Sequence, residues 1–504
     1  MAVLAGTLAM HAGVFWAIWA RTDGHFTYTL DDPYIHLALA EQIAGGTYGI
    51  NPGESASPSS SMLWPFVLAA MSIVGQVEYL PLILNTAAAL CLAYLIKRSF
   101  ECVTERSSVI VIGTLSIMLT LNFVGISFTG MEHSWHIVTA IAATLGLQVF
   151  RLTGRLPWWG VAGVVVGPWL RYEGLLVTVT AVAILWVSGA RSTAARLFLA
   201  AILPLVVFSL FLIGLGLDAL PSSVLVKNST VDRSLDIISL VDESFLYHYF
   251  LLGTALVLLA VAHLVITRSW NVLAVSTLII MGGHLALSDV GGFHRYVLYA
   301  VAAVLPATLL MTRDILAALG KPYRSIAVVA LGLVVVGTIK PMMMDTMLAP
   351  TASQEIYQQQ GQMARFVEDY WRRPVAVNDI GLVSLRPDVR VVDLWGLADR
   401  EARIARFEGE PDWLAQTVRS NQVELVMVYE PVFGAHVPSG WKKVAELTRD
   451  DPKIGWWWAT VSFFATEESA VSPLCTAVDE FAQTTPAGST MTSLCGTTSA
   501  KQAG

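Results

Sequence analysis

About eleven stretches of mostly apolar residues, each close to the length of a membrane-crossing helix, dominate this sequence. A transmembrane helix needs about 20 such residues. The stretches lie near residues 2–20, 79–96, 108–126, 134–150, 156–170, 174–190, 197–216, 246–266, 271–288, 296–312 and 325–343. Only 14% of all residues are charged, whereas an ordinary soluble domain carries about a quarter. The sequence therefore predicts a polytopic α-helical membrane protein and excludes a single soluble globule.

Charged residues are sparse up to about residue 345 and frequent after it, which divides the chain into two parts. We expect a transmembrane domain over 1–345 and a water-soluble domain over 346–504. The 31 Lys and Arg residues against 38 Asp and Glu residues leave a net charge of -7. This balance lacks the basic excess that draws proteins to nucleic acid, so the expected partner is the lipid bilayer and no nucleic acid is expected.

Loop charges predict the orientation of the spans. The stretch from Ser61 to Gly75 is short and carries Pro65, so we interpret it as an interfacial or re-entrant helix. With it excluded, basic residues gather in alternate loops, at Lys97, Arg98, Arg106, Arg151, Arg155, Arg191, Arg196, Arg268, Arg313, Lys321 and Arg324. By the positive-inside rule these loops are cytoplasmic. The first outer loop (21–78) and the C-terminal domain then lie on the outer face.

The C-terminal part has the pattern of a small α/β domain. Short apolar runs near 374–377, 389–394 and 423–429 alternate with polar helical stretches, which indicates a partly parallel sheet. Asp379 and Asp393 follow two of these runs, at the position where such sheets often bind ligands. Turns and helix caps would use the same residues, so both interpretations stay open.

The end of the chain is predicted from its composition and its cysteines. From about Thr484 it is rich in Ser, Thr, Gly and Ala, and we expect a disordered tail. The four cysteines, Cys91, Cys102, Cys475 and Cys495, match no zinc or redox spacing. In an oxidising compartment Cys475 and Cys495 could form a disulfide that orders part of the tail, and the sequence leaves this choice open.

Two adjacent carboxylates follow the first predicted span. Asp31 and Asp32 precede Pro33, which suits the first turn of a helix with Asp32 as its N-cap. We expect this helix to run to Ala44 and to lie on the membrane surface. The carboxylates could simply cap the helix or be solvated. The functional alternative is a general base with a neighbouring carboxylate, or hard oxygen ligands for a divalent cation.

Two later outer loops carry ionisable residues that a simple connector does not need. Glu132 and His133 follow the third predicted span, and Arg171 and Glu173 interrupt an otherwise apolar run. Ionisable groups near a membrane span are costly and tend to be paired and functional. Interfacial residues, or an ion pair of Arg171 with Glu173 or Glu132, are the structural alternatives.

Positive charge is expected on the same face as Asp31 and Asp32. Lys227 lies in the next outer loop, and His294 and Arg295 lie in the one after it. These side chains could extend into the lipid headgroups without further function. Alternatively, a carboxylate base opposes a group of cations suited to a phosphate.

In this order, the residues resemble the motifs of the GT-C glycosyltransferases, nearest to the group of mycobacterial terminal arabinofuranosyltransferases. The similar segments are Asp31-Asp32, Gly45-Gly46, Asn51-Pro52-Gly53-Glu54, Gly130-Met131-Glu132, Arg171-Tyr172-Glu173-Gly174, Leu220-Pro221 through Lys227-Asn228, and Arg295-Tyr296. Together they cover most of the predicted membrane domain.

The resemblance implies a GT-C-like membrane domain that transfers a sugar, with inversion, from a polyprenyl-phosphate donor to a glycan or lipid acceptor of the cell envelope. It implies that Asp31 or Asp32 is the catalytic base and that Arg or Lys residues receive the lipid phosphate. The expected donor-binding residues are Glu132, His133, Arg171, Glu173, Lys227, His294, Arg295 and Tyr296. No cofactor is required, although a divalent metal is compatible with the carboxylates. The implied location is a bacterial inner (cytoplasmic) membrane, with the C-terminal domain extracytoplasmic.

Two other classes of protein compete with this interpretation. A transporter or flippase of a lipid-linked sugar would also have many spans, but transporters usually place ionisable sites near the bilayer midplane. The candidates here fall at the outer ends of spans. An assembly factor anchored in the membrane would not need so many spans with charged outer loops.

Overall fold

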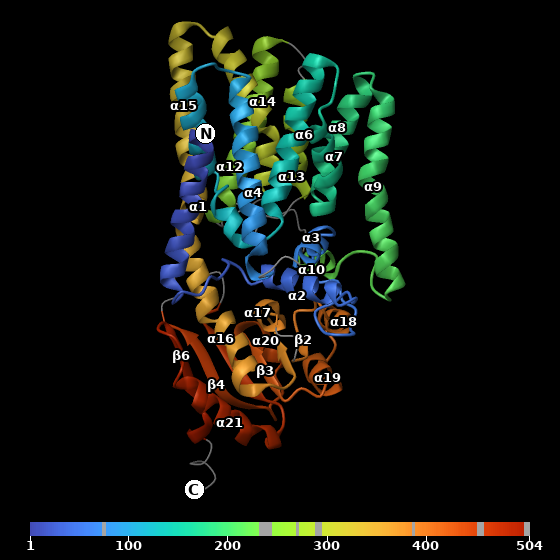
Figure 1. Cartoon of the computed structure of the whole chain (residues 1–504), viewed down its shortest axis with the longest axis vertical. Coiled ribbons are helices and arrows are strands. Elements are labelled where there is room, and N and C mark those ends of the chain that lie inside the picture. The colour runs from blue at the N-terminus through green and yellow to red at the C-terminus, as the bar shows by residue number, and fades with distance from the viewer. Residues whose placement is uncertain are drawn as a thin grey trace.

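The computed structural model of the chain is elongated, with a helical part at one end and a small sheet at the other (Figure 1). It describes residues 1–72, 77–230, 244–268, 272–287, 295–385, 389–450 and 458–497. For some helical residues, Lys227 among them, only the backbone is described. Helices α2 (Asp32–Ala44) and α3 (Trp64–Met71) lie between the two parts (Figure 1).

Apolar helices form the first part of the chain. They are α1 (Ala2–Arg21), α4 (Leu80–Glu101), α5 (Ser107–Thr120), α6 (His133–Thr153), α7 (Trp158–Leu170), α8 (Gly174–Val187), α9 (Arg191–Gly214), α12 (Ser244–Thr267), α13 (Val272–Leu287), α14 (Leu298–Ala318) and α15 (Lys321–Gln358), with the short α10 (Ser222–Thr230) at the end nearer the sheet (Figure 1). The largest cluster of buried apolar side chains joins α4, α6, α8 and α14. The α8–α9 and α14–α15 connections, which carry predicted cytoplasmic charges, lie at the end farthest from the sheet (Figure 1).

Six helical segments of the described chain are long and apolar enough to cross a membrane: Ala2–Arg21, Val77–Glu101, Ser107–Thr129, His133–Thr153, Arg191–Gly214 and Leu298–Ala318. This is fewer than the predicted eleven. Four more predicted stretches form shorter apolar helices, at Trp158–Leu170, Gly174–Val187, Leu251–Thr267 and Val272–Ala286. Helices α7 and α8 are short because Arg171 lies between them, where the predicted stretches also end and begin, and because α8 ends before Ser188-Gly189. In the described part of the stretch from Ser61 to Gly75, residues 61–72, the α-helix is the eight-residue α3, which is too short to cross.

The C-terminal part contains the predicted sheet. Its helices are α16 (Gln360–Arg365), α17 (Gly381–Ser384), α18 (Arg400–Glu408), α19 (Trp413–Ser420), α20 (Glu430–Phe433) and α21 (Glu468–Ala482), and its strands are β1 (Val375–Val377), β2 (Val391–Asp393), β3 (Leu425–Val428), β4 (Lys442–Arg449), β5 (Thr460–Ala465) and β6 (Ser489–Ser493). The strand order is β2-β1-β3-β5-β4-β6. Strands β1, β2 and β3 are parallel and the other pairs are antiparallel, so the prediction of a partly parallel sheet is confirmed.

One helix joins the two parts. Helix α15 is 38 residues long and continues without a break through the predicted boundary between residues 345 and 346. At 1.5 Å per residue it extends about 57 Å. The change in charge density therefore marks a change of environment along one helix and not a linker between domains.

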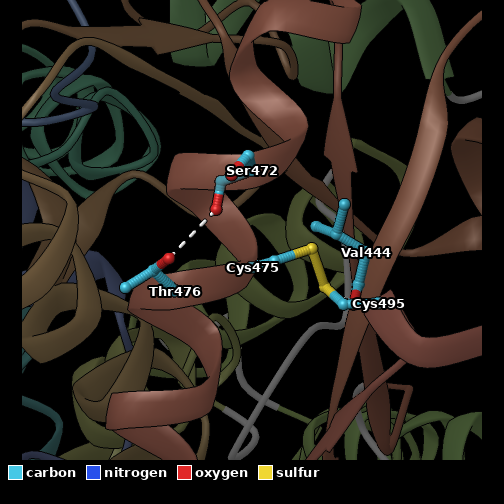
Figure 2. Close-up of a disulfide and its surroundings, with 5 residues drawn as sticks. All are labelled: Val444, Ser472, Cys475, Thr476 and Cys495. Atoms are coloured by element: carbon cyan, nitrogen blue, oxygen red, sulfur yellow. Dashed lines mark hydrogen bonds between the residues drawn. A yellow bond between two sulfur atoms is a disulfide. The ribbon is translucent and has the colours of Figure 1, made fainter.

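The predicted disordered tail is corrected in part. Residues Ser489–Ser493 form β6, which pairs with β4, and residues 498–504 lie outside the described part of the chain. Cys475 on α21 and Cys495 form a disulfide with 5.8 Å between their Cα atoms (Figure 2). Composition alone favours disorder here, but strand pairing and the covalent link to α21 hold this segment on the sheet.

Removing this disulfide is expected to loosen the last strand. The bond joins residues 20 positions apart, and closing a loop of that size is worth about 3 kcal/mol. In a Cys475→Ser/Cys495→Ser variant we expect faster hydrogen exchange in β6 and α21, measured by mass spectrometry. Cys91→Ser/Cys102→Ser is the matched control, because these cysteines form no disulfide in the described chain. Equal exchange in both variants would contradict the stabilising role.

Helix α2 ends at the predicted residue but begins one residue earlier, and its surroundings differ from the predicted ones. It runs from Asp32 to Ala44, with Asp31 and not Asp32 at the N-cap position. Every residue from Pro33 to Ala40 is buried, so α2 is not a surface helix with one apolar stripe. Its Ile35 belongs to the same apolar cluster as Val377 of the sheet. The C-terminal domain thus packs against a helix that the sequence analysis placed on the membrane surface.

Candidate functional site

Four segments far apart in the sequence meet at the end of the helical part that faces the sheet. They are the starts of α2 and α6, the turn between α7 and α8, and the residues just before α14. Three ion pairs form here: Arg171 to Glu132 at 2.8 Å, Arg171 to Glu173 at 2.7 Å, and Arg295 to Asp32 at 2.8 Å. We refer to these five residues as the polar cluster. All five were predicted as site residues.

A glycine allows the starts of α2 and α6 to approach each other. Gly130 has a φ of +69°, in the left-handed region that favours glycine. A Cβ atom at Gly130 would lie 2.6 Å from the Cβ atom of Pro33 and 2.8 Å from the ring of Tyr28. In addition, the Thr29 N–H donates to the Phe128 carbonyl at 3.1 Å. The Gly-Met-Glu segment thus places Glu132 beside the helix that carries Asp32.

Arg171, Glu132 and Glu173 form the more buried half of the polar cluster, which we call the closed half. The side chain of Arg171 is 4% exposed, and that of Glu132 is fully buried. Burial alone would lower the pKa of Arg171, but the carboxylates of Glu173 and Glu132 outweigh it and hold the pKa above its ordinary value. Burial would likewise raise the pKa of Glu173, yet Arg171 lowers it to about 2. Arg171 and Glu173 are therefore charged at neutral pH, and the carboxylates of Glu173 and Glu132 compensate the charge of Arg171.

Arg295 and Asp32 form the other half of the polar cluster, which we call the open half because Asp32 is exposed. The side chain of Arg295 is 10% exposed, whereas that of its partner Asp32 is 39% exposed. Arg295 Nη2 also donates to the Tyr296 hydroxyl at 3.0 Å, and the Tyr296 ring lies 5.0 Å from the guanidinium carbon atoms of both Arg295 and Arg171. Burial would lower the pKa of Arg295, but Tyr296 and Asp32 raise it.

The donors of Arg295 are only partly used. Its buried Nε and Nη1 atoms have no hydrogen-bond partner within the described residues. A buried polar group without a partner is rare and calls for an explanation, such as a ligand or an ordered water. The open half thus combines an accessible carboxylate with a guanidinium that can still bind an oxyanion.

Three residues beside the polar cluster were missed by the sequence analysis. His36 Nδ1 lies 3.1 Å from the Ser59 hydroxyl, and its Nε2 lies 3.7 Å from Glu132 Oε2. Ser60 accepts a hydrogen bond from Arg171 at 3.3 Å. Burial lowers the pKa of His36, so its ring is neutral at pH 7. The available signal was spacing, because His36 is four residues after Asp32 and so lies on the same face of α2.

Asp31 does not join the polar cluster. Its two carboxylate oxygens accept hydrogen bonds from the backbone N–H groups of Gly381 at 2.7 Å and Leu382 at 2.9 Å, at the start of α17. Burial and the nearby Asp379 raise the pKa of Asp31, and the hydrogen bonds from the Leu382 and Gly381 N–H groups offset part of this rise. Asp31 therefore faces the C-terminal domain, and only Asp32 faces Arg295.

The remaining predicted donor-binding residues have mixed outcomes. His133 Nδ1 lies 3.9 Å from Glu132, and its ring lies edge-on to Tyr296 at 5.5 Å, so His133 adjoins the polar cluster. For Lys227 only the backbone, in α10, is described. His294 lies outside the described residues.

The candidate ligand-binding residues of the sheet have protein partners. Asp393 accepts hydrogen bonds from the N–H groups of Trp395 and Ala398, so it stabilises the turn after β2. Asp379 accepts from the Tyr429 hydroxyl at 2.6 Å and from Gln360 at 2.8 Å. Within the described chain, no group of three or more His, Cys, Asp or Glu side chains could hold a metal ion.

Comparison with known proteins identifies one region. A family model described as a domain of unknown function (DUF8728) matches residues 354–464, which include α17 and the parallel strands. No curated protein matches the chain.

Proposed function

We propose that the protein is a membrane glycosyltransferase of the GT-C type, which transfers a sugar from a polyprenyl-phosphate donor to a glycan or lipid acceptor of the cell envelope. The observation that carries the proposal is the Asp32–Arg295 pair, an accessible carboxylate 2.8 Å from a guanidinium with unused buried donors. A group suited to acid–base chemistry and a group suited to oxyanion binding thus lie next to each other at the ends of apolar helices.

The proposed reaction assigns one task to each residue of this pair. Asp32 removes the proton from an acceptor hydroxyl, whose oxygen attacks the anomeric carbon from the side opposite the phosphate. The bond between the anomeric carbon and the phosphate oxygen breaks with inversion, and its electron pair leaves with the lipid phosphate. Arg295 receives the phosphate monoester through charge-assisted hydrogen bonds, so the leaving group needs no separate acid.

The rest of the polar cluster supports the geometry of the site. Because Glu132 and Glu173 compensate Arg171, this arginine has little charge left for a phosphate, and we assign it to hold the starts of α6 and α8 together. Its packing against Tyr296 fixes the ring on which Arg295 also lies. Arg295 is then the main phosphate-binding residue among the described cations of the cluster.

The membrane setting is also part of the proposal. Eleven spans, a bacterial inner membrane and an extracytoplasmic C-terminal domain would place the polar cluster at the outer bilayer edge. A polyprenyl chain could then lie among the apolar helices while its phosphate meets Arg295. The position of the α8–α9 and α14–α15 connections, at the end opposite the sheet, supports this orientation under the positive-inside rule (Figure 1).

A transporter or flippase of a lipid-linked sugar is the alternative. The two are separated by mass spectrometry of lipid-linked sugars in cells that carry the wild type, the Asp32→Asn variant or no protein. Transfer predicts that a polyprenyl-phosphate sugar accumulates in both deficient strains while a glycan loses one sugar residue. Unchanged lipid-linked sugars trapped on the inner leaflet would instead favour transport and refute the proposed transfer.

Arg295→Gln is expected to weaken use of the donor more than turnover of bound donor. A charge-assisted hydrogen bond contributes about 1.5–3 kcal/mol, so KM for the donor should rise about 10- to 100-fold. Arg295→Lys should recover part of this loss, since it keeps the charge but not the planar guanidinium. Arg313→Gln is the control, because Arg313 is half exposed and pairs with its neighbour Asp314. An unchanged KM in Arg295→Gln would exclude Arg295 as the phosphate-binding residue.

A further inference from the structure

We propose that the C-terminal domain, which matches a domain of unknown function, is required for the transferase site to function. The domain binds Asp31 and thereby sets the position of Asp32. Asp31 is in this view a positioning residue and not a second base. The inference rests on the proposed function for its catalytic consequence, whereas the contact itself can be tested without any substrate.

The first step of the argument is the bidentate contact of Asp31. Its Oδ2 accepts from the Gly381 N–H and its Oδ1 from the Leu382 N–H, so the carboxylate is held in both position and orientation. Asp31 is the N-cap residue of α2, and Asp32 is the first residue of that helix. Whatever fixes Asp31 therefore fixes the end of α2 from which Asp32 reaches Arg295.

The second step is the lack of space at Gly381. A Cβ atom there would lie 2.1 Å from the Asp31 carbonyl oxygen and 2.5 Å from its carboxylate carbon. Contacts below about 3.0 Å do not occur for real Cβ atoms, and the Asp31 carbonyl is backbone that cannot rotate away. Only glycine allows α17 and α2 to approach this closely.

The third step is the rigid support behind Gly381. The turn from β1 to α17 contains Asp379, which is tied to the Tyr429 hydroxyl at 2.6 Å and to Gln360 at 2.8 Å. Tyr429 follows β3, and Gln360 belongs to α16. The N–H groups that bind Asp31 are thus anchored to two further elements of the domain and do not belong to a free loop.

The rest of the first outer loop is bound in the same way. Asn51 donates to the Val391 carbonyl at 2.9 Å and accepts from the Val391 N–H at 3.0 Å, which pairs the loop with edge strand β2. Glu54 pairs with Arg390 at 2.6 Å. Ile50 enters the apolar cluster of the domain. None of these contacts involves a residue of the polar cluster, so they fix the loop without forming part of that cluster.

The contact also has a consequence for His36. Because Asp32 and His36 lie one turn apart on α2, a shift of the helix start moves both relative to Arg295 and Glu132. Reacting groups displaced by about 1 Å can lose about 100-fold in rate. The domain can therefore control the rate of transfer without touching either substrate.

The test compares Gly381→Ala and Asp31→Asn with Gly440→Ala in the full-length protein reconstituted in lipid nanodiscs. Gly381→Ala introduces the clashing Cβ atom. Asp31→Asn keeps one acceptor oxygen and turns the other into an amide that cannot accept. Gly440→Ala is the matched control, because nothing lies within 4 Å of a Cβ atom there.

The first measurement is hydrogen exchange by mass spectrometry. We expect both test variants to exchange at least about tenfold faster than wild type in peptides over 381–385 and at the start of α2, with the control unchanged and the sheet still protected. Unchanged exchange at α2 in both variants would overturn the positioning role. If Gly381→Ala also unfolds the sheet, Asp31→Asn alone decides.

The second measurement is transfer kinetics with the lipid-linked sugar found by mass spectrometry. We expect kcat to fall about 10- to 100-fold in both test variants, with KM for the donor changed less than about threefold. A purely structural defect would instead reduce the amount of folded protein and leave kcat per folded molecule intact, which would overturn the inference. If the wild type transfers no sugar, the proposed function fails, and the exchange at α2 still decides whether the domain positions Asp32.

Discussion

Asp32→Asn is expected to reduce sugar transfer by about 100- to 10,000-fold, which is the usual contribution of a general base. The amide keeps the shape of the side chain and can still accept a hydrogen bond from Arg295, but it cannot take the proton of the acceptor hydroxyl. KM for the donor should change little. The measurement is kcat in a reconstituted transfer assay, together with gel filtration to compare the amount of folded protein.

Asp23→Asn is the matched control for this prediction. Asp23 lies between α1 and α2, has a positive φ that Asn also tolerates, and accepts a hydrogen bond from the Tyr357 hydroxyl at the surface. We expect its kcat to equal that of the wild type. Full turnover in Asp32→Asn would refute the proposed base, and the same result together with normal transport of a lipid-linked sugar would favour the alternative function.

Arg171→Met is expected to have the largest effect on stability. It removes the arginine that pairs with two carboxylates, the buried Glu132 at 2.8 Å and the partly exposed Glu173 at 2.7 Å. Breaking a buried ion pair on one side costs about 3–5 kcal/mol, because an uncompensated buried charge remains. We expect a marked drop in the thermal midpoint of the purified protein, followed by fluorescence-detected gel filtration.

Two further variants separate charge from packing in this prediction. Arg171→Met/Glu132→Gln should be less destabilised than the sum of its single changes, with a coupling of about 0.5–3 kcal/mol, because one unpaired charge has been removed as well. Arg373→Met is the control. Its pair with Glu424 is largely exposed, and such pairs contribute about 0–1 kcal/mol. A thermal midpoint of Arg171→Met equal to that of the control would contradict the assignment of Arg171 as the centre of the closed half.

Three members of the polar cluster were predictable from the sequence because each of them breaks a local rule. A carboxylate or an arginine inside an apolar run is costly, so Glu132, Arg171 and Glu173 stand out without any knowledge of the fold. Their pairing was among the stated alternatives, and the structure confirms it. The order of the ionisable loops along the chain was enough to place them on one face.

Asp31 and Asp32 could not be separated in this way. They are adjacent and identical, and the difference between them depends on partners about half the chain away. Asp31 meets Gly381 across 350 positions, and Asp32 meets Arg295 across 263 positions. No periodicity or spacing carries such information. The burial of α2 was missed for the same reason, because the domain that covers it follows more than 300 residues later.

The predictions of helix length and of a disordered tail were wrong in part, for local reasons that hydropathy does not measure. The break between α7 and α8 at residues 171–173 lies where it was predicted, but average hydropathy does not register the turn at Ser188-Gly189, so α8 was predicted three residues too long at its end. Similarly, the composition after Thr484 favours disorder, but β4 supplies a partner strand for Ser489–Ser493. In both cases the local structure depends on backbone hydrogen bonding, which average hydropathy does not include.

The continuous helix α15 makes the number of residues between the helical part and the sheet a fixed quantity. One inserted residue would turn everything after it by about 100° around the helix axis and move it about 1.5 Å along that axis. Gly381 would then point away from Asp31, even though no contact residue had changed. Helix α15 therefore fixes both the distance and the rotation between the helical part and the sheet. The length of this helix determines the geometry of the site as much as the identity of the contact residues does.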